Sequence, residues 1–226
     1  SLASCGQSPQ AKTDKPELHT ITDMAGREVV VPKEINKVFC PSPVGTIFVY
    51  TLDPDLLVGW NYELRSGEKE YILAQYHSLP NLGGWYAKAT CNIEELLKIN
   101  PDVILNVGSL DVEQTNKIQE QTGIPVVMID TDDFANFDKA YEFAGKLLNL
   151  EDRANELGSY CRETVNDILA KAATIPEDQK VRVYYAEGAS GLETDPKGSS
   201  HVETLDIVGG LNVAEVDLKG GMGMTP

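Results

Sequence analysis

The stretch NIEELLKINPDVILNVG, residues 92–108, indicates most directly which kind of fold this chain adopts. Asn92, followed three residues later by Glu95, forms a capping box ahead of a run of apolar residues with helical spacing. Asn100 and Pro101 end that helix, because proline cannot continue it. Residues 103–107 then form an apolar run typical of a buried strand. A short helix that passes directly into a buried strand is typical of a parallel sheet.

Strand-like runs recur on both sides of this stretch. Residues 20–32 predict an opening hairpin, with Asp23 and Gly26 in its turn and Pro32 at its end. Further short apolar runs are separated by segments with helical spacing or caps, and they lie at residues 38–40, 56–58 and 126–129. Strands that alternate with helices predict an α/β fold with a mostly parallel sheet.

The pattern changes to a long helical stretch over residues 136–173, broken near Asn149. Its second part, from residue 151, keeps apolar residues on one face at steps of three and four. Twenty-one residues of helix at ~1.5 Å each span about 32 Å, enough to cross a small lobe. We interpret this helix, residues 151–175 with its exit, as a rigid strut between two lobes. An ordinary amphipathic helix packed on one sheet is the alternative.

The remaining residues, 176–226, predict only part of a second lobe. A strand is expected at residues 181–186, then a loop rich in Gly and Ser up to residue 200, then a short helix at 202–208. One strand and one helix cannot cover both faces of a sheet, so we expect this C-terminal lobe to be incomplete. The first lobe is expected at residues 18–150.

Composition narrows the classes of partner. The chain has 226 residues, of which 35 are acidic and 19 basic, so its formal net charge is −16. That field repels phosphate backbones, and nucleic acid is not an expected partner. The sequence contains no run of eighteen or more apolar residues, so it predicts no membrane-spanning helix.

The first residues suggest how the protein is held at a membrane. Leu2-Ala3-Ser4-Cys5 resembles a bacterial lipobox, in which the cysteine thiol takes a lipid. Residues 7–15 are polar and tether-like, so we expect residues 1–17 to form the tail of an extracytoplasmic lipoprotein anchored through Cys5. A free cysteine in a disordered tail is the alternative.

The other cysteines do not suggest a metal centre. Cys40, Cys91 and Cys161 are widely spaced, with no CxxC pair and no nearby histidine, so a structural zinc site is not expected. Cys161 is predicted to be buried and inert on the apolar face of its helix. A Cys40–Cys91 disulfide is a minority alternative.

Several segments, in order, resemble the binding proteins that serve importers of ferric siderophores, haem and cobalamin. They are DMAGREV from residue 23, LVG from residue 57, the stretch at residues 92–104, YAEG from residue 185, GLET from residue 191 and GGLNVA from residue 209. The resemblance implies two Rossmann-like α/β lobes joined by one long helix, with a metal chelate bound in the cleft between them. It also implies an ABC permease as partner, docked through one acidic residue on each lobe.

Glu94 occupies the position of the docking acid on the first lobe in that family. Physically it is a carboxylate in the first turn of a helix. Its alternative role is to complement the helix dipole, which is worth about 0.3 to 1 kcal/mol.

The ligand is expected at loops that follow the strands, because clefts of doubly wound lobes form at the carboxyl ends of strands. Trp60 falls in the loop after the second strand and Trp85 in a loop after a turn, both where a cleft is expected. Flat apolar faces with a polar edge suit a macrocycle or an aromatic chelator. Any one of these aromatic residues has a core or rim position as its alternative. The candidate ligand-binding residues are Pro43, Trp60, Tyr62, Trp85, Tyr86, Ser109, Glu187, Leu192 and His201.

His201 is also a candidate metal ligand inside a bound chelate, through its neutral imidazole. The alternative is that Ser199, Ser200 and His201 cap the helix that follows them.

An oxyanion such as molybdate is a second ligand class, held by backbone N–H groups and hydroxyls of residues such as Ser42 and Ser109. An enzyme is the remote alternative, because the chain has no nucleotide-binding glycine loop and no Gly-x-Ser-x-Gly elbow. No cofactor is expected.

Overall fold

The computed structural model describes residues 16–108 and 111–216. The chain opens with an antiparallel hairpin of β1 (Leu18–Thr22) and β2 (Glu28–Pro32), as the sequence predicts. The buried carboxylate of Asp23 organises its turn by accepting hydrogen bonds from the backbone N–H groups of Ala25 and Arg27. The same carboxylate accepts from the backbone N–H of Met128, at 3.2 Å, and so ties the hairpin to the central sheet.

That central sheet is parallel, with strand order β3-β4-β5. Its strands are β3 (Val38–Phe39), β4 (Val103–Gly108) and β5 (Val126–Asp130). The expected strand at residues 56–58 is wrong. A 3-10 turn at Pro54–Leu56 stands there instead, and only Leu57 bridges to β3, because Pro54 favours a tight turn at this point.

Helices cover both faces of this sheet, because its side chains alternate in direction along each strand. Leu105 and Val107 of β4 pack with α1 (Pro43–Leu52) and α4 (Phe137–Leu148). Ile104 points to the opposite face and packs with α2 (Ile93–Ile99) and α3 (Val112–Thr122). The result is a doubly wound lobe in which the carboxyl ends of the three strands meet at one edge.

The helix boundaries follow the predicted caps. The Asn92 side chain accepts a hydrogen bond from the backbone N–H of Glu95 at 3.2 Å, and Asn100 closes α2 in the left-handed conformation. Gly123 closes α3 in the same way, at φ 68°. Asn149, at φ 57°, breaks the long helical stretch between α4 and α5 (Glu151–Ala172).

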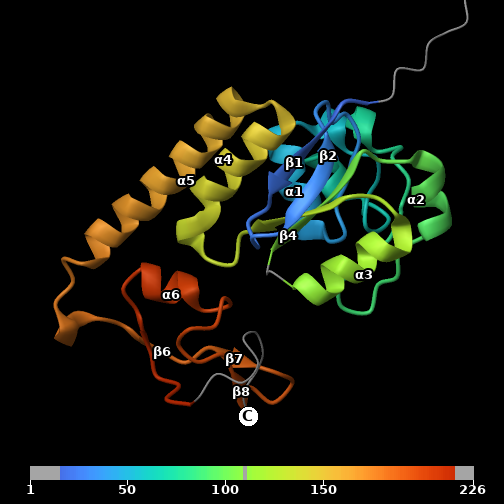
Figure 1. The fold of residues 1–226 in the computed structure, drawn as a ribbon. Coiled ribbons are helices and arrows are strands. Elements are labelled where there is room, and N and C mark those ends of the chain that lie inside the picture. Colours follow the sequence, from blue (N-terminus) through green and yellow to red (C-terminus); the bar gives the residue numbers. More distant parts are fainter. Residues whose placement is uncertain (1–15, 109–110, 217–226) are drawn as a thin grey trace, which may run out of the picture.

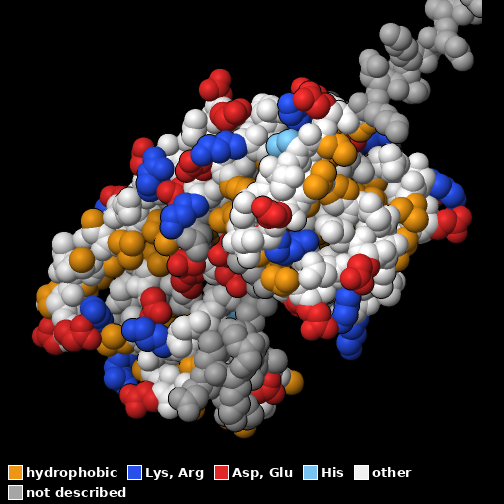
Figure 2. Space-filling model, in the orientation of Figure 1, with side chains coloured by type: hydrophobic (Ala, Val, Ile, Leu, Met, Phe, Trp, Pro, Cys, Tyr) orange, Lys and Arg blue, Asp and Glu red, His pale blue; other side chains and the backbone are white. Residues whose placement is uncertain are grey.

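Helix α5, 22 residues long, packs along α4 and leads away from the sheet toward the second part of the chain (Figure 1). Apolar side chains remain exposed along it on the visible face, where Lys and Arg side chains are dispersed among acidic ones (Figure 2). No described helix has the length and apolar character needed to cross a membrane.

The second part consists of short elements. Strand β6 (Arg182–Val183) pairs in parallel with β9 (Leu211–Asn212), and β7 (Ala186–Glu187) pairs antiparallel with β8 (Glu193–Thr194). The predicted single strand at residues 181–186 is therefore wrong in its extent, because pairing with two different partners divides it. The predicted short helix is present as α6 (Glu203–Ile207).

Candidate functional site

A cavity of about 540 Å³ lies where the carboxyl edge of the sheet faces the second part of the chain. Asn106, Val107 and Gly108 at the end of β4 form its floor, and Ser200 and Glu203 reach it from the segment around α6. Its aromatic lining residues are Trp85, Tyr86, Phe134 and Phe137. We call this cavity the cleft pocket.

The loop that carries Trp85 lies unusually close to the loop after β3. The Trp85 backbone N–H donates to the Pro41 carbonyl at 2.9 Å. A Cβ on Gly84 would stand 2.1 Å from that carbonyl oxygen, and a Cβ on Gly83 would stand 2.0 Å from the Thr90 carbonyl oxygen. Only glycine permits this approach, so the two glycines determine where the indole ring lies.

A buried amide joins the loops around the cleft pocket. The Asn61 side chain donates to the carbonyl oxygens of Cys40 and Gly83, both at 2.9 Å. Its amide oxygen accepts from the Thr46 hydroxyl at 2.6 Å. Asn61 therefore fixes three segments relative to one another: the loop after β3, the start of α1, and the loop that contains Gly83 and Gly84, called the glycine loop below. Asn61 was not among the predicted site residues, because an asparagine in a loop gives no sign in the sequence that it is buried.

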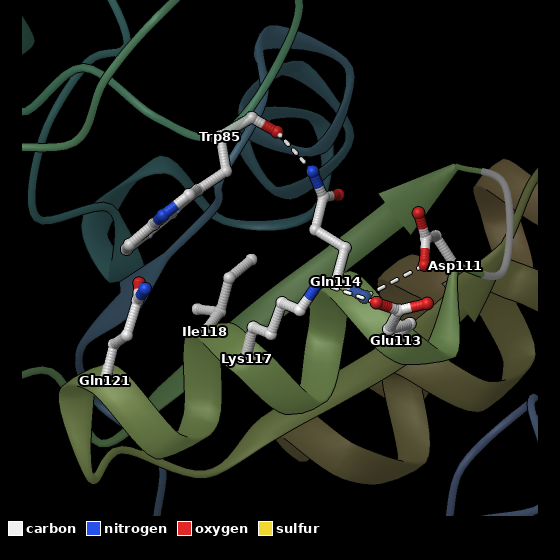
Figure 3. Close-up of a pocket in the computed structure, with 7 residues that line it drawn as sticks. All are labelled: Trp85, Asp111, Glu113, Gln114, Lys117, Ile118 and Gln121. Atoms are coloured by element: carbon white, nitrogen blue, oxygen red, sulfur yellow. Dashed lines mark hydrogen bonds and ion pairs between the residues drawn. The ribbon is translucent and has the colours of Figure 1, made fainter.

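A second cavity, of about 420 Å³, lies between the Trp85 ring and α3 (Figure 3). Its other walls come from α3, with Ile118 and Gln121 near the ring and the Lys117–Glu113 ion pair at its side. The Trp85 carbonyl accepts from the Gln114 amide at 3.4 Å. Trp85 lines this cavity and the cleft pocket, so its ring is part of the wall between them.

An apolar trough of about 430 Å³ continues the cleft pocket along α1. The trough and the cleft pocket share Val44, Val107, Thr131 and Phe137. Pro43, one of the predicted ligand-binding residues, lines the trough. Together, the trough and the cleft pocket offer an apolar surface beside a more polar one.

Among the described residues, the charged side chains that line the cleft pocket are acidic, namely Asp111, Asp132 and Glu203. Desolvation, reinforced by the charge of Asp130, raises the pKa of Asp132. Desolvation and a hydrogen bond with Asp133 raise the pKa of Glu203 to about 7. Glu203 also accepts from the backbone N–H of Phe134 at 2.8 Å, and so links α6 to the loop after β5.

The structure separates the predicted ligand-binding residues into groups. Trp85 and Tyr86 line the cleft pocket. Trp60 is 5% exposed, and its indole N–H donates to the Tyr76 carbonyl, so it lies in the packing of the first lobe. Tyr62 lines a separate shallow pocket near Lys88, and Leu192 is 74% exposed on a hairpin tip. Ser109 and Cys5 lie outside the described residues.

Glu187 and His201 lie together with Asp195, which the sequence analysis did not select. Asp195 is fully buried, and its Oδ2 lies 2.5 Å from Nδ1 of His201. Although desolvation opposes it, this hydrogen bond holds the pKa of Asp195 below its usual range. Desolvation raises the pKa of Glu187, and the neighbouring Asp195 carboxyl group, through a shared proton and through its charge, raises it further. Helix α6 has Val202 at its N-cap and no side-chain cap, so the capping role considered for His201 is not observed.

The remaining predicted positions are a surface acid and three thiols. The Glu94 side chain is 83% exposed in the first turn of α2 and pairs with Lys98 at 3.0 Å. Cys40, Cys91 and Cys161 are free in the structure, so the alternative of a Cys40–Cys91 disulfide is not supported. Cys161 is half-buried rather than fully buried. Burial raises the pKa of the Cys91 thiol to about 12, which leaves it unreactive at neutral pH.

The family model described as "Periplasmic binding protein" matches residues 71–207 of this chain. The uncharacterized ABC transporter substrate-binding lipoprotein YvrC of Bacillus subtilis (strain 168) is 24% identical in an alignment 241 residues long. That alignment covers 99% of this chain and 71% of YvrC. An ABC transporter solute binding protein from Sulfurospirillum deleyianum DSM 6946 superposes with a TM-score of 0.78 at 28% identity. That match covers 89% of this chain and 64% of the other, so the chain spans less than two thirds of that structure.

Two more distant structures share the fold. The molybdate periplasmic binding protein MolA of Haemophilus influenzae has a TM-score of 0.65 at 20% identity, with 87% of this chain and 66% of MolA covered. The siderophore binding protein BauB, bound to ferric acinetobactin, has a TM-score of 0.67 at 18% identity, with 88% and 69% covered. At these identities the likeness concerns the fold alone.

Proposed function

The chain belongs to the periplasmic binding protein family, and from this membership we propose that it is the substrate-binding component of an ABC importer. The family consists of binding proteins, which confirms the prediction that the chain is not an enzyme. The proposed role is to capture a small molecule in the cleft pocket and to deliver it to a membrane permease. The position of that pocket at the carboxyl edge of a doubly wound sheet is typical of ligand sites in such folds.

The lining of the cleft pocket supports a metal chelate of neutral or positive charge as the ligand. Trp85 and Tyr86 offer flat faces for a macrocycle or an aromatic chelator, and the adjoining trough that Pro43 lines can take an apolar body. Asp111, Asp132 and the ionised fraction of Glu203, whose pKa is about 7, give this pocket a negative field. The observation that carries the proposal is this pairing of an aromatic wall with acidic side chains.

A bare oxyanion is the second candidate, favoured by the likeness to the molybdate-binding MolA fold. The described lining of the cleft pocket contains no Lys or Arg, and its carboxylates repel an anion. Ser42 lines the pocket, but α1 behind it begins at Pro43, which lacks a backbone N–H donor. The described residues therefore support the chelate better than the oxyanion.

The experiment that tests the ligand class is a thermal-shift screen of the whole chain against haem, cobalamin, ferric siderophores of differing charge, molybdate and tungstate. A ligand that binds only the native state raises stability by about 2.7 kcal/mol at a hundredfold excess over its dissociation constant. We expect a shift with a neutral or cationic chelate. Trp85→Ala should abolish that shift, whereas Tyr71→Ala, at a position 87% exposed and outside the described pockets, should preserve it.

The outcomes separate the alternatives. A shift confined to molybdate and tungstate would replace the chelate by the oxyanion and keep the importer role. A chelate shift that survives Trp85→Ala would place the ligand elsewhere on the molecule. Absence of any shift would contradict the proposed function.

We further propose that the protein acts outside the cytoplasm as a lipoprotein anchored through Cys5, with Glu94 as a docking contact for the permease. The likeness to a substrate-binding lipoprotein supports the anchor, and the exposure of Glu94 supports docking. In cells that depend on the importer, Glu94→Ala should lower uptake while ligand affinity stays unchanged. Glu113→Ala, a matched exposed acid paired with a lysine at the same spacing, is the control. Equal uptake by both variants would remove Glu94 from the docking surface.

A further inference from the structure

Three side chains that can bind a cation converge in the second part of the chain, outside the lining of the cleft pocket. Glu187 ends β7, Asp195 directly follows β8, and His201 lies just before α6. One potential ligand atom from each lies within 4.8 Å of the other two. We call these three residues the EDH cluster.

Two oxygen atoms of the EDH cluster are buried without a partner. Asp195 is 0% exposed, and its Oδ1 accepts no hydrogen bond from the described residues. The same holds for Oε2 of Glu187. Buried carboxylate oxygens are nearly always paired, because an unpaired one forfeits its hydration without compensation. Two such oxygens in one cluster therefore point to a cation as the missing partner.

The surrounding contacts hold the ligand atoms in place. The Asn212 amide of β9 donates to the Asp195 carbonyl at 2.9 Å, which fixes the backbone of this residue. The 2.5 Å contact between Asp195 and Nδ1 orients the His201 ring. The β7–β8 pairing, which places Glu187 opposite Glu193, fixes the position of Glu187. A cluster held from three elements loses little entropy when it binds an ion.

The donor set determines the kind of cation. Two ligands on one ion at ~2.1 Å each lie about 3 to 4.2 Å apart, so ligand atoms within 4.8 Å of one another can reach one ion after a small adjustment of the side chains. Two carboxylates and one imidazole suit first-row transition metals better than Mg²⁺ or Ca²⁺, which prefer oxygen ligands alone. We propose that Glu187, Asp195 and His201 bind one divalent transition-metal cation, such as Zn²⁺ or Mn²⁺, directly.

This site differs from the chelate site of the proposed function, because the protein itself supplies the ligands of the ion. Three protein ligands leave at least one coordination position for water or another molecule. The His201 side chain is 46% exposed, which leaves a path to solvent. All three proposed metal ligands come from the second part of the chain. The proposed metal site therefore does not depend on which class of molecule binds in the cleft pocket.

Isothermal titration of the untagged whole chain with ZnCl₂ and MnCl₂, with MgCl₂ as the hard-cation comparison, tests the site. We expect one Zn²⁺ or Mn²⁺ per chain and no measurable Mg²⁺ binding. Removing a single ligand by Glu187→Gln or His201→Gln should weaken binding about tenfold or more. Glu193→Gln, on the facing strand, and His77→Gln, in the first lobe, should each change affinity less than about threefold, within what a lost neighbouring charge explains.

Co²⁺ provides a readout that does not depend on stability. The intensity of its visible absorption reports inner-sphere coordination, and this band should be lost in His201→Gln, at a half-exposed position where folding is not at risk. Absence of stoichiometric Zn²⁺ and Mn²⁺ binding would overturn the proposal and leave Glu187 and Asp195 as a pair that shares a proton. Equal weakening by His201→Gln and His77→Gln would also overturn it, whereas a failed chelate screen would bear only on the proposed function.

Discussion

The two parts of the chain bury different kinds of side chain. In the first lobe, Leu105, Ile129 and their neighbours form a continuous apolar core on each face of a parallel sheet. In residues 176–216, the buried set includes the polar Thr194, Asp195 and Ser199. The strands of this part are two residues long, whereas β4 has six. Apolar packing thus positions the first lobe, and hydrogen bonds around Asp195 position much of the second part.

The difference shows how each part can hold functional groups. A sheet with covered faces presents loops at its edge in fixed positions, and these loops form most of the cleft pocket. The second part contributes single side chains such as Glu203, whose positions depend on a few polar contacts. We therefore expect mutations in the first lobe to change stability most and mutations in the second part to change local chemistry.

The largest expected effect comes from the core of the first lobe. Leu105→Ala removes a fully buried side chain from the middle of β4 and should lower the free energy of unfolding by about 2–5 kcal/mol. Leu205→Ala, on partly buried α6, should cost less than about 2 kcal/mol. Urea denaturation of both variants measures the contrast. Similar losses for the two would mean that the second part has an equally important apolar core.

The next effect tests the polar link at the edge of the sheet. Asn61→Ala leaves the carbonyls of Cys40 and Gly83 and the Thr46 hydroxyl without their partner. Each buried group left unpaired costs about 1–3 kcal/mol, so we expect a loss near 3 kcal/mol with partial relaxation. Ligand affinity should also fall, because the glycine loop that carries Trp85 loses its anchor. A loss of stability with unchanged affinity would show that Gly83 and Gly84 hold the loop alone.

A smaller effect concerns the contact between the two parts. The pKa of Glu203 is raised to about 7 from an ordinary value near 4.5, so the folded state binds the proton more tightly than the unfolded state. This contribution is full at low pH and is lost as pH rises from about 4.5 through 7. Glu203→Gln keeps an acceptor for the Phe134 N–H and a donor for Asp133. Melting temperatures from pH 5 to 8 should therefore fall less in the variant than in the unmodified protein, and parallel curves would contradict this role.

The smallest effect is expected at the surface. Glu94 and Lys98 are both largely exposed, and such pairs contribute about 0–1 kcal/mol. Glu94→Ala should therefore change the midpoint of urea denaturation very little. A large change would mean that the stability of α2 depends on this pair. A loss of uptake in Glu94→Ala would then not distinguish a docking contact from a loss of stability.

Much of the first lobe could be predicted from the sequence, because caps and apolar periodicity are local signals. Asn92 and Asn100 mark helix ends by their own chemistry, and the structure confirms both. The strand at residues 56–58 was wrong because an apolar run of three residues does not distinguish a strand from a turn.

The site was harder to predict, because it depends on which loops meet. Trp85 and Tyr86 were expected at the cleft in a loop after a turn, and they do line the cleft pocket. Trp60 was expected at the cleft in a loop after a strand, yet its N–H reaches the Tyr76 carbonyl and its ring is buried. Asp195 and Asn61 become apparent only from hydrogen bonds between segments that the fold brings together, to His201 and to the Cys40 carbonyl.

The contrasting places of the two tryptophans give the molecule a built-in optical reporter. Trp60 is buried in a fixed hydrogen bond and does not line the cleft pocket, so a guest there should not touch its ring. Trp85 lies half-buried in the wall between two cavities, where an aromatic or metal-bearing guest would quench or shift its emission. Contact with a guest should therefore change the emission of Trp85 more than that of Trp60, and occupancy can be followed in unlabelled protein by comparison with Trp85→Phe.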